Sequence, residues 1–264
     1  MTTPGRTLLA VHLDRSNILR PVLPSLRAGL AHLLEGQADG PDDLQVVLST
    51  GNDLTRTLSD GSHPVPVPAT ATEARAALPA RLRPLAGPDL PNAAGRLLDA
   101  VGDELASRDA ADRPDRVVVL LVGEGGVGTA DALRERIEHQ RATYAWEFVL
   151  VDVSAGPVPA PGWGPKQPVR AGTGDGAGKG AVAVAERPER PDPAARFGIP
   201  AGAVLTSGPG ADGVTAGLEA ASGFVRRARG TAAWEPVEGF SGDERAAADV
   251  PDTRPAWRRL LRLS

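Results

Sequence analysis

The sequence predicts a doubly wound α/β fold, in which a mostly parallel central sheet is flanked by helices on both faces. Apolar, strand-like segments alternate with amphipathic, helix-like segments along most of the chain. Several strand-like segments are almost continuously aliphatic, as strands are when helices cover both faces of a parallel sheet. Such an alternation favours right-handed crossovers between parallel strands. A chain of 264 residues is long enough to build a sizeable core of this kind.

The first part of the chain predicts two strands with a helix between them. Residues 7–13 and 44–50 are the apolar strands, and residues 21–35 form the helix. Leucines spaced three or four positions apart give this helix an apolar stripe along one face. Pro21 and Pro24 are compatible with it because both fall in its first turn.

The pattern continues after a proline-rich segment, where only a short helix at 72–78 is expected. Four longer elements follow: a helix at 93–108, a strand at 116–122, a helix at 130–142 and a strand at 146–153. Aliphatic and β-branched residues fill the 116–122 segment almost without interruption, which is typical of a central parallel strand.

The last third of the chain defines the predicted domain boundaries. Residues 154–195 are rich in Gly, Pro and Ala, and predict a long flexible loop inserted into the domain. Ordered structure is expected again at 197–207, followed by a closing helix at 212–229. The prediction is one domain over residues 1–229 and a polar C-terminal tail over 230–264.

Composition narrows the classes of function. The net charge is −4 and the isoelectric point is about 5.6, so no overall basic field attracts nucleic acid. The absence of cysteine excludes disulfides and cysteine-bound metals, and fits a reducing cytosol. No apolar run approaches the roughly 20 residues that span a bilayer, and no signal peptide is visible. We expect a cytoplasmic protein without a transmembrane segment.

The order of these segments resembles the von Willebrand factor type A (vWA) domain. The residues that carry the resemblance are an apolar strand ending in Leu-Asp-Arg-Ser, a helix with Leu-Leu-Asp-Ala-Val, and the strand Trp-Glu-Phe-Val-Leu-Val-Asp-Val. The segment that begins with Phe-Gly-Ile-Pro at 197–200 is similar to the end of bacterial intracellular vWA proteins. The resemblance covers about residues 5–229. It implies a binding surface at the carboxyl edge of the sheet, around residues 14–18, 92–95 and 123–128.

The resemblance also implies a metal-ion-dependent adhesion site, of which only part is present. Asp14 and Ser16 occupy the first two ligand positions, and Glu124 is the acid nearest to the third loop. Mg²⁺ prefers six oxygen ligands, which separate loops of such a domain share. Three of the five ligand positions lack an oxygen donor: Ile18, Gly95 and Gly123. The site is therefore expected to be degenerate, and Asp14 has the simpler interpretation that it ends the strand and caps a turn.

Evidence for catalysis is weak in the sequence. The four histidines, His12, His32, His63 and His139, show neither metalloprotease spacing nor a visible Ser-His-Asp order. His12 lies within the first strand and is expected to be packed rather than catalytic. The Gly-rich segment 172–180 lacks the first glycine and the final hydroxyl of a phosphate-binding loop.

These observations predict a non-catalytic vWA-like protein-interaction or scaffold module with no cofactor. Its partner would be another protein, such as a MoxR-type ATPase or an operon partner. The basic, amphipathic segment Trp257–Leu263 suits a partner groove or a lipid surface. Two alternatives remain open: a vWA domain that binds weak Mg²⁺ or Mn²⁺, and an α/β nucleotide-binding protein or enzyme that uses the Gly-rich loop.

Overall fold

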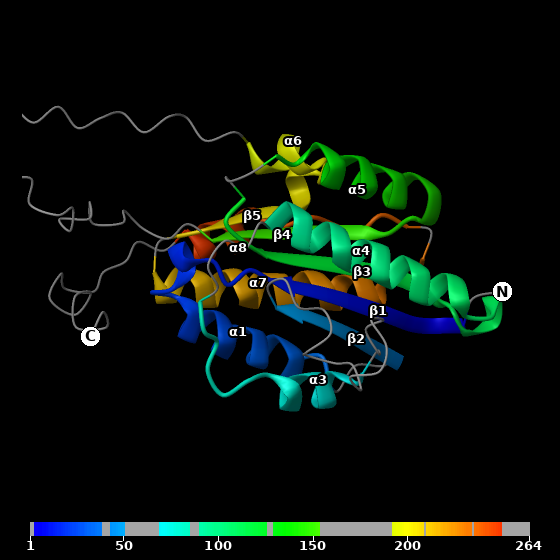
Figure 1. The fold of residues 1–264 in the computed structure, drawn as a ribbon, viewed down its shortest axis with the longest axis horizontal. Coiled ribbons are helices and arrows are strands. Elements are labelled where there is room, and N and C mark those ends of the chain that lie inside the picture. Colours follow the sequence, from blue (N-terminus) through cyan, green and yellow to red (C-terminus); the bar gives the residue numbers. More distant parts are fainter. Residues whose placement is uncertain are drawn as a thin grey trace, which may run out of the picture.

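The central sheet contains five parallel strands in the order β2-β1-β3-β4-β5 (Figure 1). The computed structural model describes the following residues: 3–38, 43–50, 69–84, 90–125, 129–153, 192–208, 210–233 and 235–249. Within them, the strands are β1 (Thr3–Leu13), β2 (Asp43–Thr50), β3 (Pro114–Gly123), β4 (Glu147–Val153) and β5 (Val204–Ser207). Each of the four neighbouring pairs is parallel. The predicted α/β fold is confirmed.

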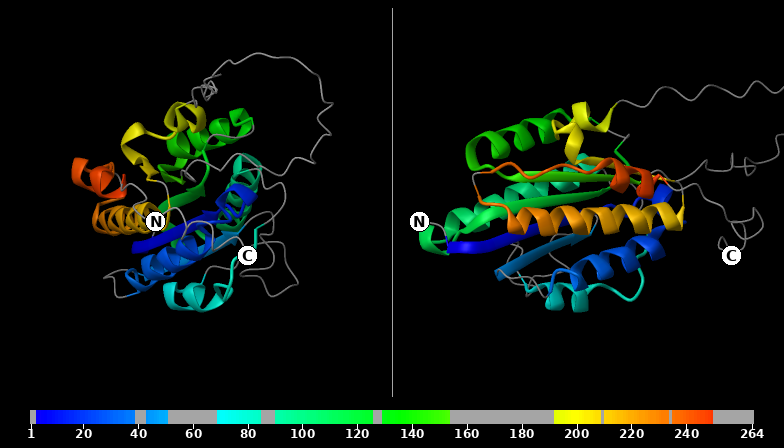
Figure 2. Two further views of the ribbon diagram at one scale, coloured as in Figure 1. Left: turned by 90° about the vertical axis from the view of Figure 1, so that its left-hand side faces the viewer. Right: turned by 180° about the vertical axis from the view of Figure 1, so that it is seen from behind.

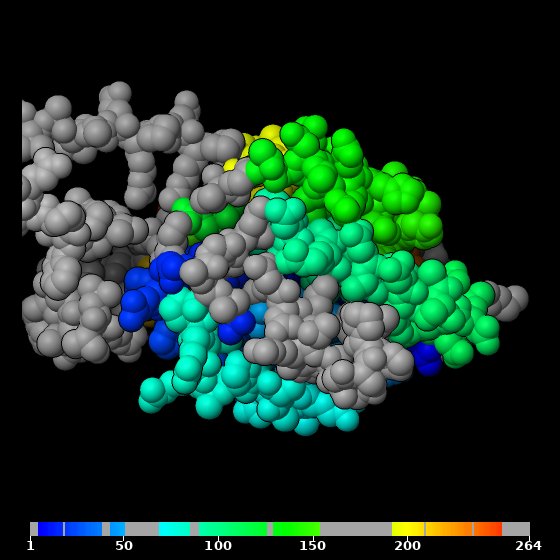
Figure 3. Space-filling view, viewed as in Figure 1, coloured from blue at the N-terminus to red at the C-terminus, as the bar shows by residue number. Residues whose placement is uncertain are grey.

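Helices cover both faces of this sheet and make three layers (Figures 1 and 2). One face is covered by α1 (Leu23–Glu35) and α7 (Ala211–Gly230), and the other by α4 (Leu90–Ser107) and α5 (Asp131–Tyr144). Figure 3 shows α4 and α5, in teal to green, on the side turned to the viewer. These four helices begin within a few residues of the four helices predicted from the sequence.

Within the described residues, three shorter helices lie around these layers: α3 (Ala71–Ala77), α6 (Pro193–Phe197) and α8 (Gly242–Ala248). Contacts place α3 against α1 and β2, α6 against α5, and α8 against α7 and β5. The remaining helical turns are the 3₁₀ helices η1 (Asn17–Leu19), η2 (Ala110–Asp112) and η3 (Ala201–Ala203). The helix α3 corresponds to the short helix predicted at 72–78.

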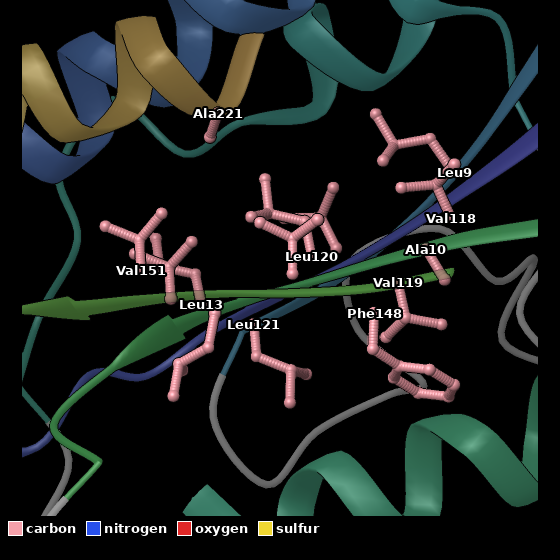
Figure 4. Packing of buried hydrophobic residues seen from close by; sticks show 14 of the residues in the cluster. Leu9, Ala10, Leu13, Val118, Val119, Leu120, Leu121, Phe148, Val151 and Ala221 are labelled. Carbon is pink, nitrogen blue, oxygen red and sulfur yellow. The ribbon is translucent and has the colours of Figure 1, made fainter. Parts of the chain in front are cut away.

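Aliphatic side chains from the strands fill the space between the layers. Figure 4 shows Leu120 on the side of the sheet that holds Ala221 of α7, while Leu121 and Phe148 point to the opposite side. All four residues are at most 1% exposed. Successive residues of a strand point to opposite faces, so the continuous aliphatic run in β3 serves both cores at once.

A buried arginine on β3 forms hydrogen bonds with the backbone of the segment that follows α7. The side chain of Arg116 is only 3% exposed, and its Nη1 lies 3.2 Å from Oε1 of Glu147. Its Nη2 donates to the backbone carbonyls of residues 231, 232 and 235, at 3.1 Å in the case of Glu235. The guanidinium therefore gives hydrogen-bond partners to carbonyls that follow α7 and belong to no helix or strand.

The structure describes only parts of the loop predicted at 154–195 and of the tail predicted at 230–264. The helix α6 begins at Pro193, inside the segment predicted as a loop, and residues 235–249 pack against the domain. The Gly-rich segment 172–180 and the amphipathic segment Trp257–Leu263 lie outside the described residues. Within the part of the chain that the structure describes, no helix combines the length and apolar character needed to cross a membrane.

The connections between strands create a switch point at the carboxyl ends of β1 and β3. The helix after β1 packs on one face of the sheet, and the helix after β3 packs on the other. The two connections therefore leave neighbouring strands in opposite directions. In open α/β sheets, this is the place where a ligand-binding crevice forms.

Candidate functional site at the carboxyl edge of the sheet

Three buried acidic residues follow or end the central strands at this edge. Asp14 follows β1, Glu124 follows β3, and Asp152 lies near the end of β4; their exposed fractions are 3%, 8% and 6%. The register aligns Leu13 with Val122 and Gly123 with Asp152, so the three acids come from adjacent positions of neighbouring strands. Sequence reasoning selected Asp14 and Glu124 but missed Asp152. Its signal was an acid between two valines near the end of an otherwise apolar run.

Asp14 ends β1 and closes a turn. Its backbone amide donates to the carbonyl of Val122 at 2.8 Å, which continues the pairing of β1 with β3 by one residue. Its Oδ1 accepts a hydrogen bond from the backbone amide of Ser16 at 2.9 Å. A carboxylate that binds the amide two residues later is an Asx turn, a common start for the 3₁₀ helix that follows here. The turn-forming role expected for Asp14 is therefore present.

The environment of Asp14 favours its neutral form. Burial is the largest cause and raises the pKa of this carboxyl above its ordinary value, and the charge of Glu124 raises it further. Hydrogen bonds from Ser16 and from the backbone of Glu124 lower the pKa, but they offset only part of the rise. Two carboxylates that share a buried region disfavour each other's ionisation.

The loop Gly123-Glu124-Gly125 packs between Asp14 and Asp152. A Cβ at Gly123 would lie 2.6 Å from the Cβ of Asp14, closer than real side chains approach. The backbone amide of Gly125 donates to Oδ1 of Asp152 at 2.8 Å. The two glycines thus let the main chain of the loop approach both aspartates directly.

The described donor atoms do not fit a magnesium site. Mg²⁺ requires near-octahedral oxygen ligands at about 2.1 Å. Among the described residues, no group of three or more His, Asp or Glu side chains lies close enough together to hold a metal ion. Oδ1 of Asp14 already accepts the Ser16 amide, and a Cβ at Gly95, in α4, would have the Arg136 guanidinium at 3.8 Å as its nearest neighbour. The positive charge of the Arg136 guanidinium would repel a metal ion at this ligand position.

A buried histidine lies under the same edge. Nδ1 of His12 is 3.1 Å from the hydroxyl of Ser49, its neighbour on β2, and both residues are at most 1% exposed. Burial, followed by the charges of Arg96 and Arg15, lowers the pKa of His12 to about 3. His12 is therefore a neutral, packed residue at ordinary pH. His32 and His139 lie on α1 and α5, and His63 is outside the described residues.

Comparison with known proteins assigns no family to this chain. No family model matches the sequence, and no curated protein matches it. The vWA resemblance therefore remains a hypothesis based on the motifs of the sequence, whereas the three-layer α/β fold is observed.

Proposed function

We propose that this chain is a non-catalytic, vWA-like protein-interaction or scaffold module that docks a partner protein at the carboxyl edge of its sheet without a metal ion. One observation carries the proposal: two of the three acids at this edge bind the chain's own backbone amides. Asp14 binds the amide of Ser16, and Asp152 binds the amide of Gly125. Groups engaged in this way shape a rigid surface rather than bind a cation.

Burial of the polar groups supports a binding role over a catalytic one. A histidine next to a serine could indicate nucleophilic chemistry, but such chemistry needs the pair to touch a substrate. His12 and Ser49 are 1% and 0% exposed and lie within the sheet. A hydrogen bond between them satisfies two polar groups in the core, which is a structural role.

The proposed docking surface consists of the exposed residues around the buried acids. Asn17 and Arg20 follow β1, and Thr129 precedes α5; all three are exposed. Asn17 begins η1, and Arg20 lies between η1 and α1, so two helical elements position these residues next to the end of β1. Recognition surfaces on α/β folds are commonly built this way, with exposed connections positioned by buried strands.

Crosslinking at two opposite ends of the sheet tests the proposal. A photoreactive residue at Asn17 should crosslink a partner protein in cells, and the same residue at Tyr144 should not. Tyr144 is a suitable control because it is 60% exposed and ends α5, at the amino edge of the sheet. Equal crosslinking at both positions would contradict docking at the carboxyl edge.

Calorimetry with the purified partner then tests the metal-free part of the proposal. We expect the affinity to be the same in EDTA and in Mg²⁺, and to fall at least tenfold in Arg20→Glu. Tyr144→Ser should bind like the wild type. Loss of binding in EDTA would overturn the metal-free proposal.

Metal-dependent adhesion is the second candidate, favoured by the burial of two neighbouring carboxylates, Asp14 and Glu124. A cation between them would relieve their repulsion. A metal with a Kd of 1 mM would stabilise the protein by about 1.4 kcal/mol at 10 mM. We expect no change in Tm with 10 mM MgCl₂ or MnCl₂; an increase that Asp14→Asn abolishes would establish this candidate instead.

A further inference from the structure

The last described part of the chain is strongly acidic. Residues 235–249 carry five acids and a single arginine. Contacts join α8, which lies in this segment, to α7 and β5, and the right-hand view of Figure 2 shows α7 in orange beside α8 in red. We call the exposed acids of α7 and of residues 235–249 the acidic face: Asp212, Glu219, Glu235, Glu238, Asp243 and Asp249.

The arginines of the same two segments do not pair with the acidic face. Within the described residues, no ion pair includes any of these six acids. Arg227 is bound to Glu244 at 2.7 Å, while Arg229 and Arg245 donate to backbone carbonyls of other segments, both at 2.8 Å. Arg226 is the one exposed arginine in the described residues of α7 and 235–249. An excess of negative charge therefore faces the solvent here.

The helices on the opposite face of the sheet differ in this respect. Arg136 of α5 lies 2.9 Å from Asp99 of α4, and Arg134 lies within 4.0 Å of both Asp131 and Glu138. Several acids of α4 and α5 thus have a cation beside them. Like charges that gather without such partners repel one another, and a cationic group bound among them lowers that repulsion.

The chain continues from the acidic face into a basic segment. Residues 250–264 contain one acid, Asp252, and four arginines, at positions 254, 258, 259 and 262. The carbonyl of Ala248 accepts a hydrogen bond from the amide of Gly208 at 2.7 Å, and Gly208 follows β5 directly. The chain therefore leaves α8 at the carboxyl end of β5, close to the start of α7.

This exit point brings the basic segment within reach of the whole acidic face. An extended chain spans at most about 3.6 Å per residue, so the path from Asp249 to Trp257 covers up to about 29 Å. The helix α7 has 20 residues and is about 30 Å long. A tether of this length keeps the segment at an effective concentration on the order of millimolar, so individually weak ion pairs are sufficient for docking.

We propose that the segment Trp257–Leu263 docks on the acidic face of its own chain, through its arginines. The exposed side of α8 also carries Ala246 and Ala247, which give the leucines of the segment an apolar area next to Asp243. The proposal uses other residues than the docking surface around Asn17 and Arg20, so it stands or falls separately from the proposed function.

A spin label on the full chain tests the proposal. The chain contains no cysteine, so Ser264→Cys takes a single nitroxide label. In low salt, we expect the label to broaden the amide signals of Glu219 and Asp243 roughly threefold more than those of Asp103 and Glu135, on α4 and α5. About 0.5 M NaCl should remove this difference, because it shortens the screening length to about 4 Å.

Charge reversal locates the contact on this face. Glu219→Lys combined with Asp243→Lys should abolish the selective broadening at both amides. Asp103→Lys combined with Glu135→Lys changes the net charge equally and should leave the broadening as in the wild type. If the first pair prevents folding, Arg258→Glu with Arg259→Glu should abolish the broadening, and Arg258→Lys with Arg259→Lys should keep it.

Three results would overturn the proposal. Equal broadening of all four amides in low salt would leave the segment available to a partner groove or a lipid surface. Selective broadening that survives both charge reversals would show that the arginines do not bind the acids. Broadening in a mixture of spin-labelled chains and isotope-labelled chains without the label would make a second copy the occupant.

Discussion

Gly123 lies against Asp14 so closely that a Cβ at position 123 would fall 2.6 Å from the Cβ of Asp14. This contact joins the loop after β3 to the turn after β1, at the point where the two connections leave the sheet in opposite directions. The loop after β3 therefore lies directly against the turn after β1 at the place where open α/β sheets form a ligand-binding crevice.

Gly123→Ala should destabilise the fold, because the new methyl group displaces either Asp14 or β3. Overpacking of this kind costs about 1–3 kcal/mol. Gly102→Ala is the control: a Cβ there has its nearest neighbour, Gln140 Nε2, at 3.9 Å, and the position is within α4. That variant should gain about 0.5–1 kcal/mol from helix propensity. Urea unfolding of both variants checks the opposite signs; stabilisation by Gly123→Ala would contradict the contact.

His12 should make the protein sensitive to acid. Its pKa is about 3 in the folded state and 6.5 in its ordinary state, so the unfolded chain binds one more proton between these values. Stability is therefore fully present above pH 6.5 and declines as the pH falls toward 3. The slope is roughly 1.4 kcal/mol per pH unit from this residue alone.

Denaturant unfolding between pH 4 and 7.5 measures this slope. His12→Asn keeps an amide that can bond to Ser49 but does not titrate, and should flatten the pH dependence. His139→Asn, on the exposed surface of α5, should leave the wild-type slope unchanged. An equal slope in wild type and His12→Asn would show that His12 is protonated in the folded protein.

Removing the charge of Glu124 should lower the pKa of Asp14, but should reverse only part of its rise. Burial is the larger cause of the raised pKa, and the Glu124 charge adds to it. In Glu124→Gln, the pKa of Asp14 should fall and still remain above its ordinary value. Carbon-detected NMR titration of the Asp14 carboxyl measures both values, with Glu138→Gln on α5 as a distant control. No change in Glu124→Gln would mean that the two carboxylates are not coupled.

Arg116→Met should loosen the segment after α7. The substitution keeps an unbranched apolar stem, but leaves the carbonyls of residues 231, 232 and 235 without their donor. We expect a loss of about 2–4 kcal/mol, as for other buried polar groups that lose a partner. Arg136→Met breaks a more exposed pair with Asp99 and should cost less than about 1 kcal/mol. Equal costs for the two variants would argue against a special role of Arg116.

Local patterns were sufficient to predict most of the fold. The uninterrupted aliphatic run at 116–122 became the central strand β3, and the leucine stripe at 21–35 became α1. Both predictions rest on the spacing of apolar residues, which indicates whether one face or both faces of a segment are buried. The boundaries differ by a few residues, because the ends of elements depend on caps and neighbours rather than on periodicity.

The candidate site was only partly visible in this way. Asp14 stands out because it ends an apolar strand, and its turn to Ser16 is a local interaction. Asp152 was missed because its role depends on the amide of Gly125, which is distant in sequence. Residues 235–249 were predicted as part of a polar tail, since their attachments are made by Arg227 and Arg245 rather than by an apolar stripe.

By itself, the sequence determined the order of strands and helices, the burial of the aliphatic segments and the place where β1 ends. Only the tertiary structure decided which acids share the carboxyl edge, how closely Gly123 packs against Asp14, and that α8 packs against β5. The reason is physical. Secondary structure and burial follow from the spacing of side chains within one segment, whereas these contacts join backbone and side-chain groups of segments that meet only once the core has packed.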